Sequence, residues 1–255
     1  MNYIIVIPSY NREELLKKTT LPLLKDIPSS IDINVLTDID YQYNLTDRFK
    51  QITAPKGIGN VRNFIRRNWK GHKVLMIDDD IDSIDELVIN MIDGSKKLEP
   101  IDNLHEFIMN CWSVADEKCA NLWGVNLYHN AFFCRNTLTT KICYINGSFT
   151  GLNLNNKQDI EKSLQTELDH FEDFDFTIQT FIRDGTVLKF NNVCLKTKCF
   201  RAEGGIAEEV GGLKKRKEKA IINGKILQER FPGYCTLYKK KKFDVYNLKL
   251  KYPKK

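Results

Sequence analysis

Short, unbroken apolar runs alternate with amphipathic segments along the chain. The apolar runs predict strands at 3–7, 33–37 and 73–77. Apolar residues at helical spacing predict helices at 13–24, 60–69 and 104–118. This alternation is typical of an α/β sheet, in which ligands bind at the carboxyl ends of the strands.

The pattern continues beyond residue 80 with less regular spacing. It predicts helices at 84–91, 172–183 and 218–231 and strands at 122–128, 141–145 and 186–190. Gly147 and Gly151 lie between two of the apolar segments. Small residues there either line a sugar or acceptor pocket or turn a hairpin.

Three consecutive carboxylates follow the strand at 73–77. Asp78 and Asp80 point to the same side of an extended chain, so they can converge on one cation. Adjacent carboxylates repel each other, and Mg²⁺ or Mn²⁺ binds oxygen ligands while leaving room for phosphate. The alternative is a helix N-terminus, with Asp80 or Asp82 as its cap and the other acids favouring the helix dipole.

Polar residues also follow the first two strands. In the loop at 8–12, Tyr10 can stack on a base and Arg12 can pair with a phosphate, or the loop only caps a helix. Asp38 can accept a hydrogen bond from a ribose hydroxyl or a base N–H, although ordinary turn chemistry explains it almost as well.

Two glycines, Gly57 and Gly59, precede the helix predicted at 60–69. They allow the backbone to approach a ligand closely, and the helix N-terminus then faces an anion. Arg62 is the basic residue nearest this loop within the helix. A second acidic cluster at 167–175 holds more acids than capping needs, so one of them is a candidate general base. His170 in this cluster is a metal ligand, an acid–base group or a structural histidine.

Charge is distributed unevenly. Residues 196–255 hold 18 Lys or Arg and 6 Asp or Glu, a net charge of +12, whereas the whole chain carries +6. Two basic runs, at 214–217 and 239–242, are interleaved with aromatic residues that can stack on bases. This composition suits a polyanionic partner, nucleic acid first, although on charge alone a solubilising tail is the simpler explanation.

The composition also excludes several classes of protein. No apolar run is long enough to span a membrane, and the apolar start is too short for a signal peptide. The seven cysteines form no C-x-x-C pair, which argues against a disulfide framework and a structural zinc site. We therefore expect a cytoplasmic protein with no membrane span.

Four motifs occur in a fixed order: Pro8-Ser9-Tyr10-Asn11-Arg12, then Gly57-x-Gly59-Asn60-x-x-Asn63, then Asp78-x-Asp80, then Glu172-Asp173. Together they resemble nucleotide-sugar glycosyltransferases of the GT-A fold. They look most like the TET-associated glycosyltransferases of bacteriophages, which are thought to modify hydroxymethylated pyrimidines in DNA. The resemblance covers about residues 3–190. It implies a Rossmann-like mixed sheet flanked by helices in a domain at 1–195, followed by a basic C-terminal extension at 196–255 that packs on it.

The resemblance also implies a role for each motif. The donor, UDP-glucose or a similar UDP-sugar, would be bound by Pro8, Ser9, Tyr10, Asn11, Arg12, Asp38, Gly57, Gly59, Asn60, Arg62, Asp78 and Asp79. Asp80 and Asp78 would hold the Mn²⁺ or Mg²⁺ ion, with Asp80 the direct ligand. Asp173, ahead of Glu172, would be the catalytic base. The acceptor or nucleic acid would contact Lys214, Lys215, Arg216, Lys217, Lys239 and Lys240.

The resulting hypothesis is a metal-dependent, inverting glycosyltransferase that acts on 5-hydroxymethylpyrimidine in phage DNA, in the host cytoplasm. The chain lacks the Q-x-x-R-W motif of many processive members, which disfavours a polysaccharide synthase. No histidine follows His170, so the third metal ligand stays open. The alternatives are a GT-A enzyme acting on a protein, lipid or glycan, and a non-catalytic nucleic-acid-binding protein.

Overall fold

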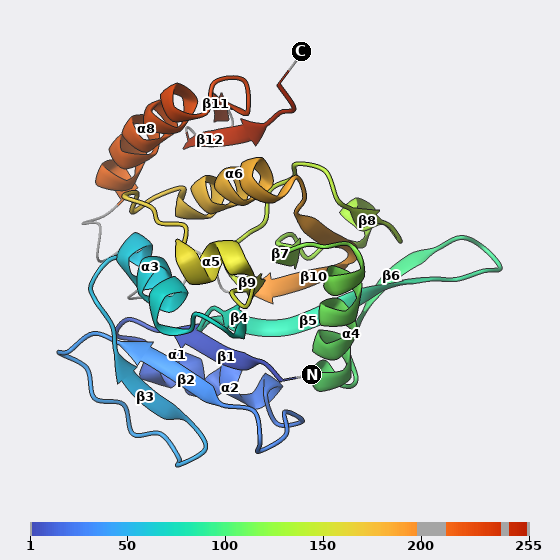
Figure 1. The fold of residues 1–255 in the computed structure, drawn as a ribbon. Helices are drawn as coiled ribbons and strands as arrows, with labels where there is room; N and C mark the ends of the chain where they lie inside the picture. Colours follow the sequence, from blue (N-terminus) through green and yellow to red (C-terminus); the bar gives the residue numbers. More distant parts are fainter. Residues whose placement is uncertain (1, 198–212, 241–244, 254–255) are drawn as a thin grey trace.

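One large mixed sheet forms the centre of the molecule (Figure 1). The computed structural model describes residues 2–197, 213–240 and 245–253, apart from the side chains of 213, 214 and 216. The described strands lie in the order β3-β2-β1-β4-β9-β7-β10-β5-β6, and the short β8 (Leu138–Thr139) pairs with β10. The α/β fold class predicted from the sequence is confirmed.

The first half of the sheet is parallel. β1 (Ile4–Pro8) lies between β2 (Ile33–Thr37) and β4 (Lys73–Ile77), and β3 (Lys50–Thr53) extends the sheet beyond β2. Because these strands run in one direction, the segments that follow β1, β2 and β4 meet at one edge of the sheet.

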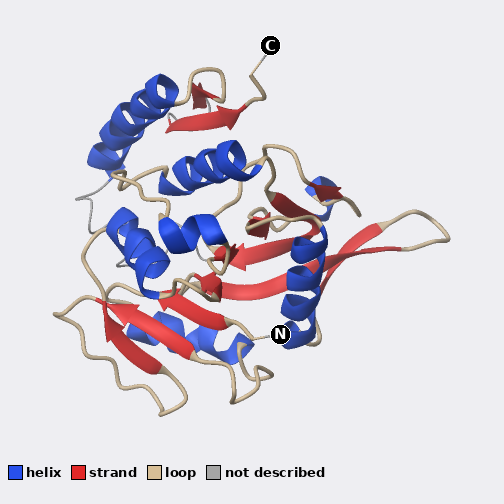
Figure 2. Cartoon of the chain, viewed as in Figure 1, coloured by secondary structure: helices blue, strands red, loops and turns tan. Residues whose placement is uncertain are grey.

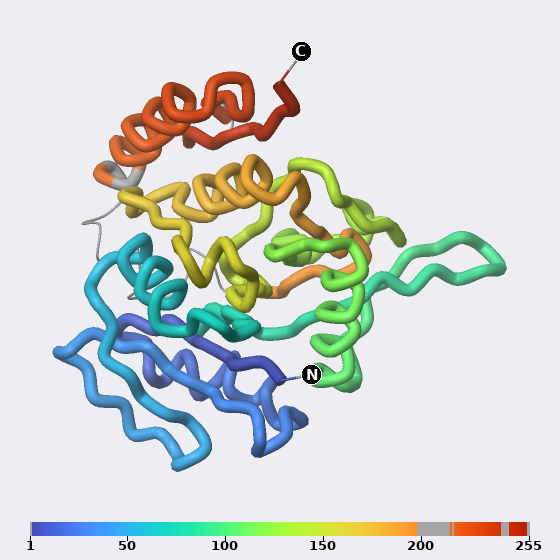
Figure 3. Tube along the Cα trace, viewed as in Figure 1, coloured from blue at the N-terminus to red at the C-terminus, as the bar shows by residue number. Residues whose placement is uncertain are grey.

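The second half of the sheet is mixed. β9 (Phe149–Asn153) runs antiparallel between β4 and β7 (Leu122–Asn126), and β10 (Leu188–Thr197) is parallel to β7. β5 (Ile81–Ile89) pairs with β10 and continues into a hairpin with β6 (Lys96–Pro100). The tip of this hairpin projects from the body (Figure 3).

Helices cover both faces of the sheet (Figure 2). One face packs against α1 (Glu13–Lys18), α2 (Thr20–Leu23) and α4 (Leu104–Glu117). Trp112 of α4 and Trp123 of β7 form the centre of this apolar layer, with ring centroids 5.2 Å apart. A short 3-10 helix, η1 (Ala131–Phe133), follows β7.

The opposite face packs against α3 (Ile58–Asn68) and α6 (Glu172–Asp184). The short α5 (Lys157–Glu161) lies on the same side, where an Arg66–Asp159 contact of 3.8 Å joins it to α3. Gly185 caps the C-terminus of α6 in the left-handed conformation that glycine adopts readily.

A third layer covers the outer side of α6. It consists of α8 (Leu213–Arg230) and the hairpin of β11 (Cys235–Lys240) and β12 (Val245–Leu250), which we call the C-terminal layer. Phe174 and Ile178 of α6 belong to the same buried apolar cluster as Leu227 of α8. The base of the C-terminal layer is therefore built on the helix that carries the second acidic cluster.

Three predicted elements are wrong. The segment at 84–91 lies mostly in β5, because it hydrogen-bonds to β10 and β6 on its two sides. The segment at 141–145 is not a strand; the strand of this region is β9, where Gly151 packs under the Trp123 ring. The helix predicted at 13–24 is interrupted at Thr19. Within the described ranges, no helix combines the length and apolar character that crossing a bilayer requires.

Candidate active site

The three aspartates after β4 are held by groups from several elements. The Asp78 carbonyl accepts from the Thr20 hydroxyl at 2.8 Å, which ties the aspartate loop to α2. Asp79 accepts from Ser9 Oγ at 2.7 Å and from Arg12 Nη1 at 3.2 Å. Burial raises the pKa of Asp79 to about 6, although Arg12 opposes the shift. Asp79 therefore holds the loop after β1 in place.

Asp80 has a different environment from Asp79. Only 5% of the residue is exposed, and its Oδ1 has no hydrogen-bond partner among the described residues. Burial, followed by the charges of Asp78 and Asp79, raises the pKa of Asp80 to about 7. Arg12 Nη1, at 3.8 Å from Oδ2, is too distant for a hydrogen bond. A buried carboxylate oxygen without a partner fits a cation ligand.

A divalent ion fits these residues only in part. The described ranges contain no cluster of three or more carboxylate, imidazole or thiol groups that could hold a metal ion. Asp80 and Asp78 can therefore supply a minority of the ligands. Mg²⁺ keeps several waters and is commonly bound by one or two carboxylates together with substrate phosphates, so this donor set fits an ion that arrives with a diphosphate.

A second group of polar residues lies where β2 and β3 end. Lys56 Nζ is 3.1 Å from Asp38 Oδ2 and lies over the Tyr10 ring at 5.5 Å from its centroid. Hydrogen bonds to Asp38 and Tyr10 raise the pKa of Lys56. The Tyr10 ring also meets Tyr41 edge-on at 5.2 Å. An aromatic face beside a carboxylate can bind a planar base with an N–H donor.

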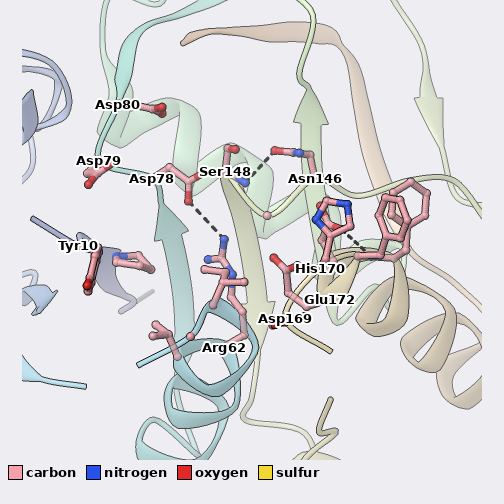
Figure 4. A pocket seen from close by; sticks show the side chains of 18 of the residues that line it. Tyr10, Arg62, Asp78, Asp79, Asp80, Asn146, Ser148, Asp169, His170 and Glu172 are labelled. Atoms are coloured by element: carbon pink, nitrogen blue, oxygen red, sulfur yellow. Dashed lines mark hydrogen bonds and ion pairs between the residues drawn. The ribbon is translucent and has the colours of Figure 1, made fainter. Parts of the chain in front are cut away.

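Arg62 of α3 lines the cavity between the two acidic groups. Its Nη2 is 3.3 Å from Asp78 Oδ1, and its charge lowers the pKa values of Glu172 and Asp173 against the effect of burial. Figure 4 shows Arg62 pointing at Asp78, with Glu172 on its other side. Gly147 lies against the guanidinium, since an added Cβ there would be 2.7 Å from Nη2.

The second acidic pair begins α6. Phe171 precedes the pair in the left-handed conformation (φ 65°), which turns the chain into the helix. Burial, followed by the charge of Asp173, raises the pKa of Glu172 to about 8. Burial also raises the pKa of Asp173, although the Tyr144 hydroxyl donates to its Oδ2 and the Phe174 amide donates to its Oδ1. The raised pKa of Asp173 makes its carboxylate a stronger proton acceptor, which suits a general base.

These groups line one cavity of about 980 Å³. Of the residues predicted to form the site, the lining includes Pro8, Ser9, Tyr10, Arg12, Asp38, Gly57, Arg62, Asp78, Asp79, Asp80, Glu172, Asp173, Lys217 and Lys240. The structure therefore brings together residues from all four sequence motifs and from the C-terminal layer.

Five predicted residues lie elsewhere. Asn11, Asn60, Lys215 and Lys239 are exposed and are not among the lining residues. Gly59 packs against the Leu168 carbonyl, so its closest contact is with the chain itself. The side chains of Lys214 and Arg216 lie outside the described residues.

Sequence reasoning gave no role to several residues of the cavity. Lys56, Tyr144 and Asn146 line it. The Tyr43 hydroxyl forms a hydrogen bond of 3.1 Å with Ser9 Oγ, and Ser9 also lines the cavity. The segment around Asn146 carried a weak signal, because its small residues were expected at a pocket or a turn. Tyr144 carried none, since it contacts Asp173 from 29 positions away in the sequence.

Comparison with known proteins gives the fold. No protein-family model and no curated protein matches the chain. Residues 1–349 of S. aureus TarS, in complex with UDP-GlcNAc, align over 91% of this chain and 73% of that chain, with 15% identity and a TM-score of 0.51. Glucosyl-3-phosphoglycerate synthase from Mycobacterium tuberculosis, in complex with Mn²⁺, UDP and glucosyl-3-phosphoglycerate, aligns over 99% of this chain and 87% of that chain, with 13% identity and a TM-score of 0.50.

The chain has the GT-A fold. The architecture expected from the sequence resemblance is therefore confirmed. Within this GT-A fold the cavity lies at the carboxyl ends of β1, β2 and β4, where ligands bind in open α/β sheets.

Proposed function

We propose that the protein is a metal-dependent glycosyltransferase that moves a sugar from a UDP-sugar to a hydroxyl acceptor. The observation that carries this proposal is the arrangement of two acidic groups on either side of Arg62 in one cavity. Asp78 and Asp80 lie on one side, and Glu172 lies on the other, with Asp173 next to it in the chain. The GT-A fold, the UDP-GlcNAc in one structural neighbour and the UDP in the other support the donor class.

Each group has a distinct task in this reaction. Tyr10 and Asp38 bind the uracil, and Arg62 binds the diphosphate. A divalent ion held by Asp80 and Asp78 would stabilise the charge that develops on the leaving diphosphate. Asp173 removes the proton of the acceptor hydroxyl as that oxygen attacks the anomeric carbon. Because one displacement takes place, a UDP-α-sugar gives a β-linked product.

We further propose that the acceptor is DNA that contains a 5-hydroxymethylpyrimidine. Lys217 of α8 and Lys240 of β11 line the cavity, and exposed Lys215 and Lys239 lie on the same two elements. Lysines close to the cavity that contains Asp173, the proposed general base, suit contact with a phosphate backbone. The competing proposal is a protein, lipid or glycan acceptor, for which these lysines form a solvated or membrane-contacting surface.

The test is transfer from a panel of UDP-sugars to duplex DNA with 5-hydroxymethylcytosine or 5-hydroxymethyluracil. Reactions contain Mn²⁺ or a chelator, and the digested nucleosides are analysed by mass spectrometry. We expect a hexose mass on the modified base only with Mn²⁺, its loss in Asp80→Ala, and retained donor binding without transfer in Asp173→Asn. An α-linked product would contradict the single displacement.

Two other outcomes separate the alternatives. Metal-dependent hydrolysis of the donor without a DNA product would keep the glycosyltransferase and exclude the DNA acceptor. DNA binding without turnover of any donor would leave a non-catalytic nucleic-acid-binding protein. Lys240→Glu tests the DNA surface, with Lys25→Glu as a control at an exposed position outside the cavity lining. We expect only the first to weaken DNA binding, and affinity to fall steeply with salt.

A further inference from the structure

A chain of hydrogen bonds leads from the backbone beside β9 to the Asp173 carboxylate. The Ser148 amide donates to Asn146 Oδ1 at 2.8 Å. Asn146 Nδ2 donates to the Tyr144 hydroxyl oxygen at 3.0 Å, and the Tyr144 hydroxyl donates to Asp173 Oδ2. Figure 4 shows Asn146 beside Ser148 at the wall of the cavity.

The direction of this chain is fixed by its first member. A backbone amide can only donate, so the oxygen of the Asn146 amide group must face Ser148. The Asn146 nitrogen, which can only donate, then faces Tyr144. The Tyr144 hydroxyl accepts this bond and its own hydrogen is left for Asp173. The network therefore favours an ionised Asp173, which is the form that accepts a proton.

The same backbone unit also holds the aspartate loop. The carbonyl of Ser148 accepts from the Asp78 amide at 2.8 Å, where β9 meets the end of β4. One residue thus connects the start of the aspartate loop with the network that ends at Asp173. This connection links the position of the Asp173 carboxylate to that of the aspartate loop.

Asp173 has few acceptor positions left. Its Oδ1 accepts from the Phe174 amide at 2.8 Å, its Oδ2 accepts from Tyr144, and the Gly147 amide donates to the same carboxylate. An ionised carboxylate has about four acceptor positions. These three donors therefore leave roughly one for an acceptor hydroxyl.

We propose that Tyr144, oriented by Asn146, is a positioning residue that fixes the Asp173 carboxylate in the orientation that receives the acceptor proton. This inference rests on the proposed function. Tyr144 itself touches Asp173 and does not exchange a proton with the substrate. Its ring stacks on Phe174 with centroids 4.1 Å apart and planes at 15°, and Tyr144→Phe keeps this packing.

Tyr144→Phe leaves the charged surroundings of Asp173 unchanged. These are Arg62 of α3, Asp78 after β4, Lys217 of α8, Lys240 of β11, and Asp169, His170 and Glu172 on its own segment. In Tyr144→Phe we expect kcat to fall on the order of tenfold to a hundredfold, with an unchanged KM for the donor. The acidic limb of the pH–rate profile moves to higher pH, because a hydrogen bond to the ionised form is lost.

Asn146→Asp tests the direction of the network with the phenol in place. One oxygen of the new aspartate accepts from the Ser148 amide, as Asn146 Oδ1 does. The second oxygen accepts the Tyr144 hydroxyl hydrogen, which is then no longer donated to Asp173. We expect a fall in kcat like that of Tyr144→Phe. In the double variant, Asn146→Asp should lower kcat by a smaller factor than it does in the wild-type background. The reason is that Tyr144→Phe has already removed the phenol hydrogen that the new carboxylate would divert.

Tyr3→Phe is the matched control. It removes a buried phenol that bonds to His105 Nδ1 at 3.0 Å and lies outside the cavity lining. We expect it to lower stability without changing the pH–rate profile. If Tyr144→Phe behaves like Tyr3→Phe, or retains the kcat and pH profile of the wild type, the positioning role is excluded while the proposed function stands.

A titration without substrate separates this outcome from failure of the proposed function. The protein is labelled with ¹³C at the aspartate carboxyl carbons, and Asp173 is assigned from the Asp173→Asn spectrum. We expect Asp173 to titrate at higher pH in Tyr144→Phe than in the wild type, and an unchanged titration overturns the inference. The titration of Asp173 can shift in Tyr144→Phe while the wild-type protein turns over no nucleotide sugar. That outcome excludes the base role along with the proposed function.

Discussion

The Arg62 guanidinium lies 3.3 Å from the Asp78 carboxylate, with only 5% of the Arg62 side chain exposed. Its Nε has no hydrogen-bond partner among the described residues. Such a cation is costly to bury unless further anionic groups approach it. The diphosphate of the proposed UDP-sugar donor would supply them.

Arg62→Met should therefore weaken binding of UDP in the presence of Mn²⁺. A hydrogen bond to a charged group contributes about 1.5–3 kcal/mol, so the loss in affinity should be roughly tenfold to a hundredfold. Isothermal titration calorimetry measures it. Arg67→Met is the control, because Arg67 is an exposed arginine on the same helix. Equal affinities of the two variants would exclude contact between Arg62 and the diphosphate.

Asp80→Asn should separate stability from metal-dependent binding. The substitution removes a charge that is repelled by Asp78 and Asp79 and has an unpartnered oxygen. The Tm without ligands should rise, by about 2–4 °C for each kcal/mol gained in a chain of this size. The rise in Tm that Mn²⁺ and UDP produce in the wild type should disappear. If the ligands stabilise the variant as much as the wild type, Asp80 is not a ligand of the ion.

Glu172→Gln should change how stability depends on pH. The pKa of Glu172 is about 8 in the folded protein, whereas the ordinary value of 4.5 applies in the unfolded chain. Between these values the folded state binds the extra proton, so the free energy of unfolding falls as pH rises. Glutamine does not titrate, so the variant should have a higher Tm than the wild type at about pH 9 and a similar Tm at about pH 4. Glu106→Gln, at an exposed position, should show neither effect. A difference in Tm between Glu172→Gln and the wild type that stays constant from about pH 4 to about pH 9 would exclude the raised pKa of Glu172.

Gly59→Ala should disturb the site through packing. The added Cβ would be 2.0 Å from the Leu168 carbonyl oxygen, so α3 and the segment before α6 must separate. Asn63 bonds to both the amide and the carbonyl of Thr166 in the same contact. We expect a loss of about 1–3 kcal/mol in urea unfolding, together with lower kcat. Asn68→Ala, at an exposed position of α3, should leave kcat unchanged. If Gly59→Ala has the same free energy of unfolding as the wild type, α3 can separate from the segment before α6 without loss of stability.

The parallel half of the fold could be predicted because its signals are local. The strands at 33–37 and 73–77 match β2 and β4, and their polar ends identified the aspartates and Asp38. Each strand is buried on both faces, so its apolar run is continuous. The residues after such strands come together by topology alone, which sequence reasoning can use.

The mixed half could not be predicted because its structure depends on distant partners. Residues 84–91 have apolar positions at helical spacing, yet pairing with β10 and β6 places most of them in a strand. Gly151 suggested a pocket or a turn, whereas in the structure its lack of a side chain makes room for the Trp123 ring. Tyr144 gave no local signal for a similar reason, since its partner is on α6.

The helix α6 has a different neighbour on each of its sides. Phe181 packs toward the sheet, whereas Phe174 and Ile178 pack toward α8. A chain shortened to residue 195 would expose this second apolar side, so we expect such a fragment to aggregate or to be degraded. The outer surface of the C-terminal layer has no such constraint. Under the proposed function, residues there that contact an acceptor could therefore change in evolution while the inner surface continues to support the helix that begins at Glu172.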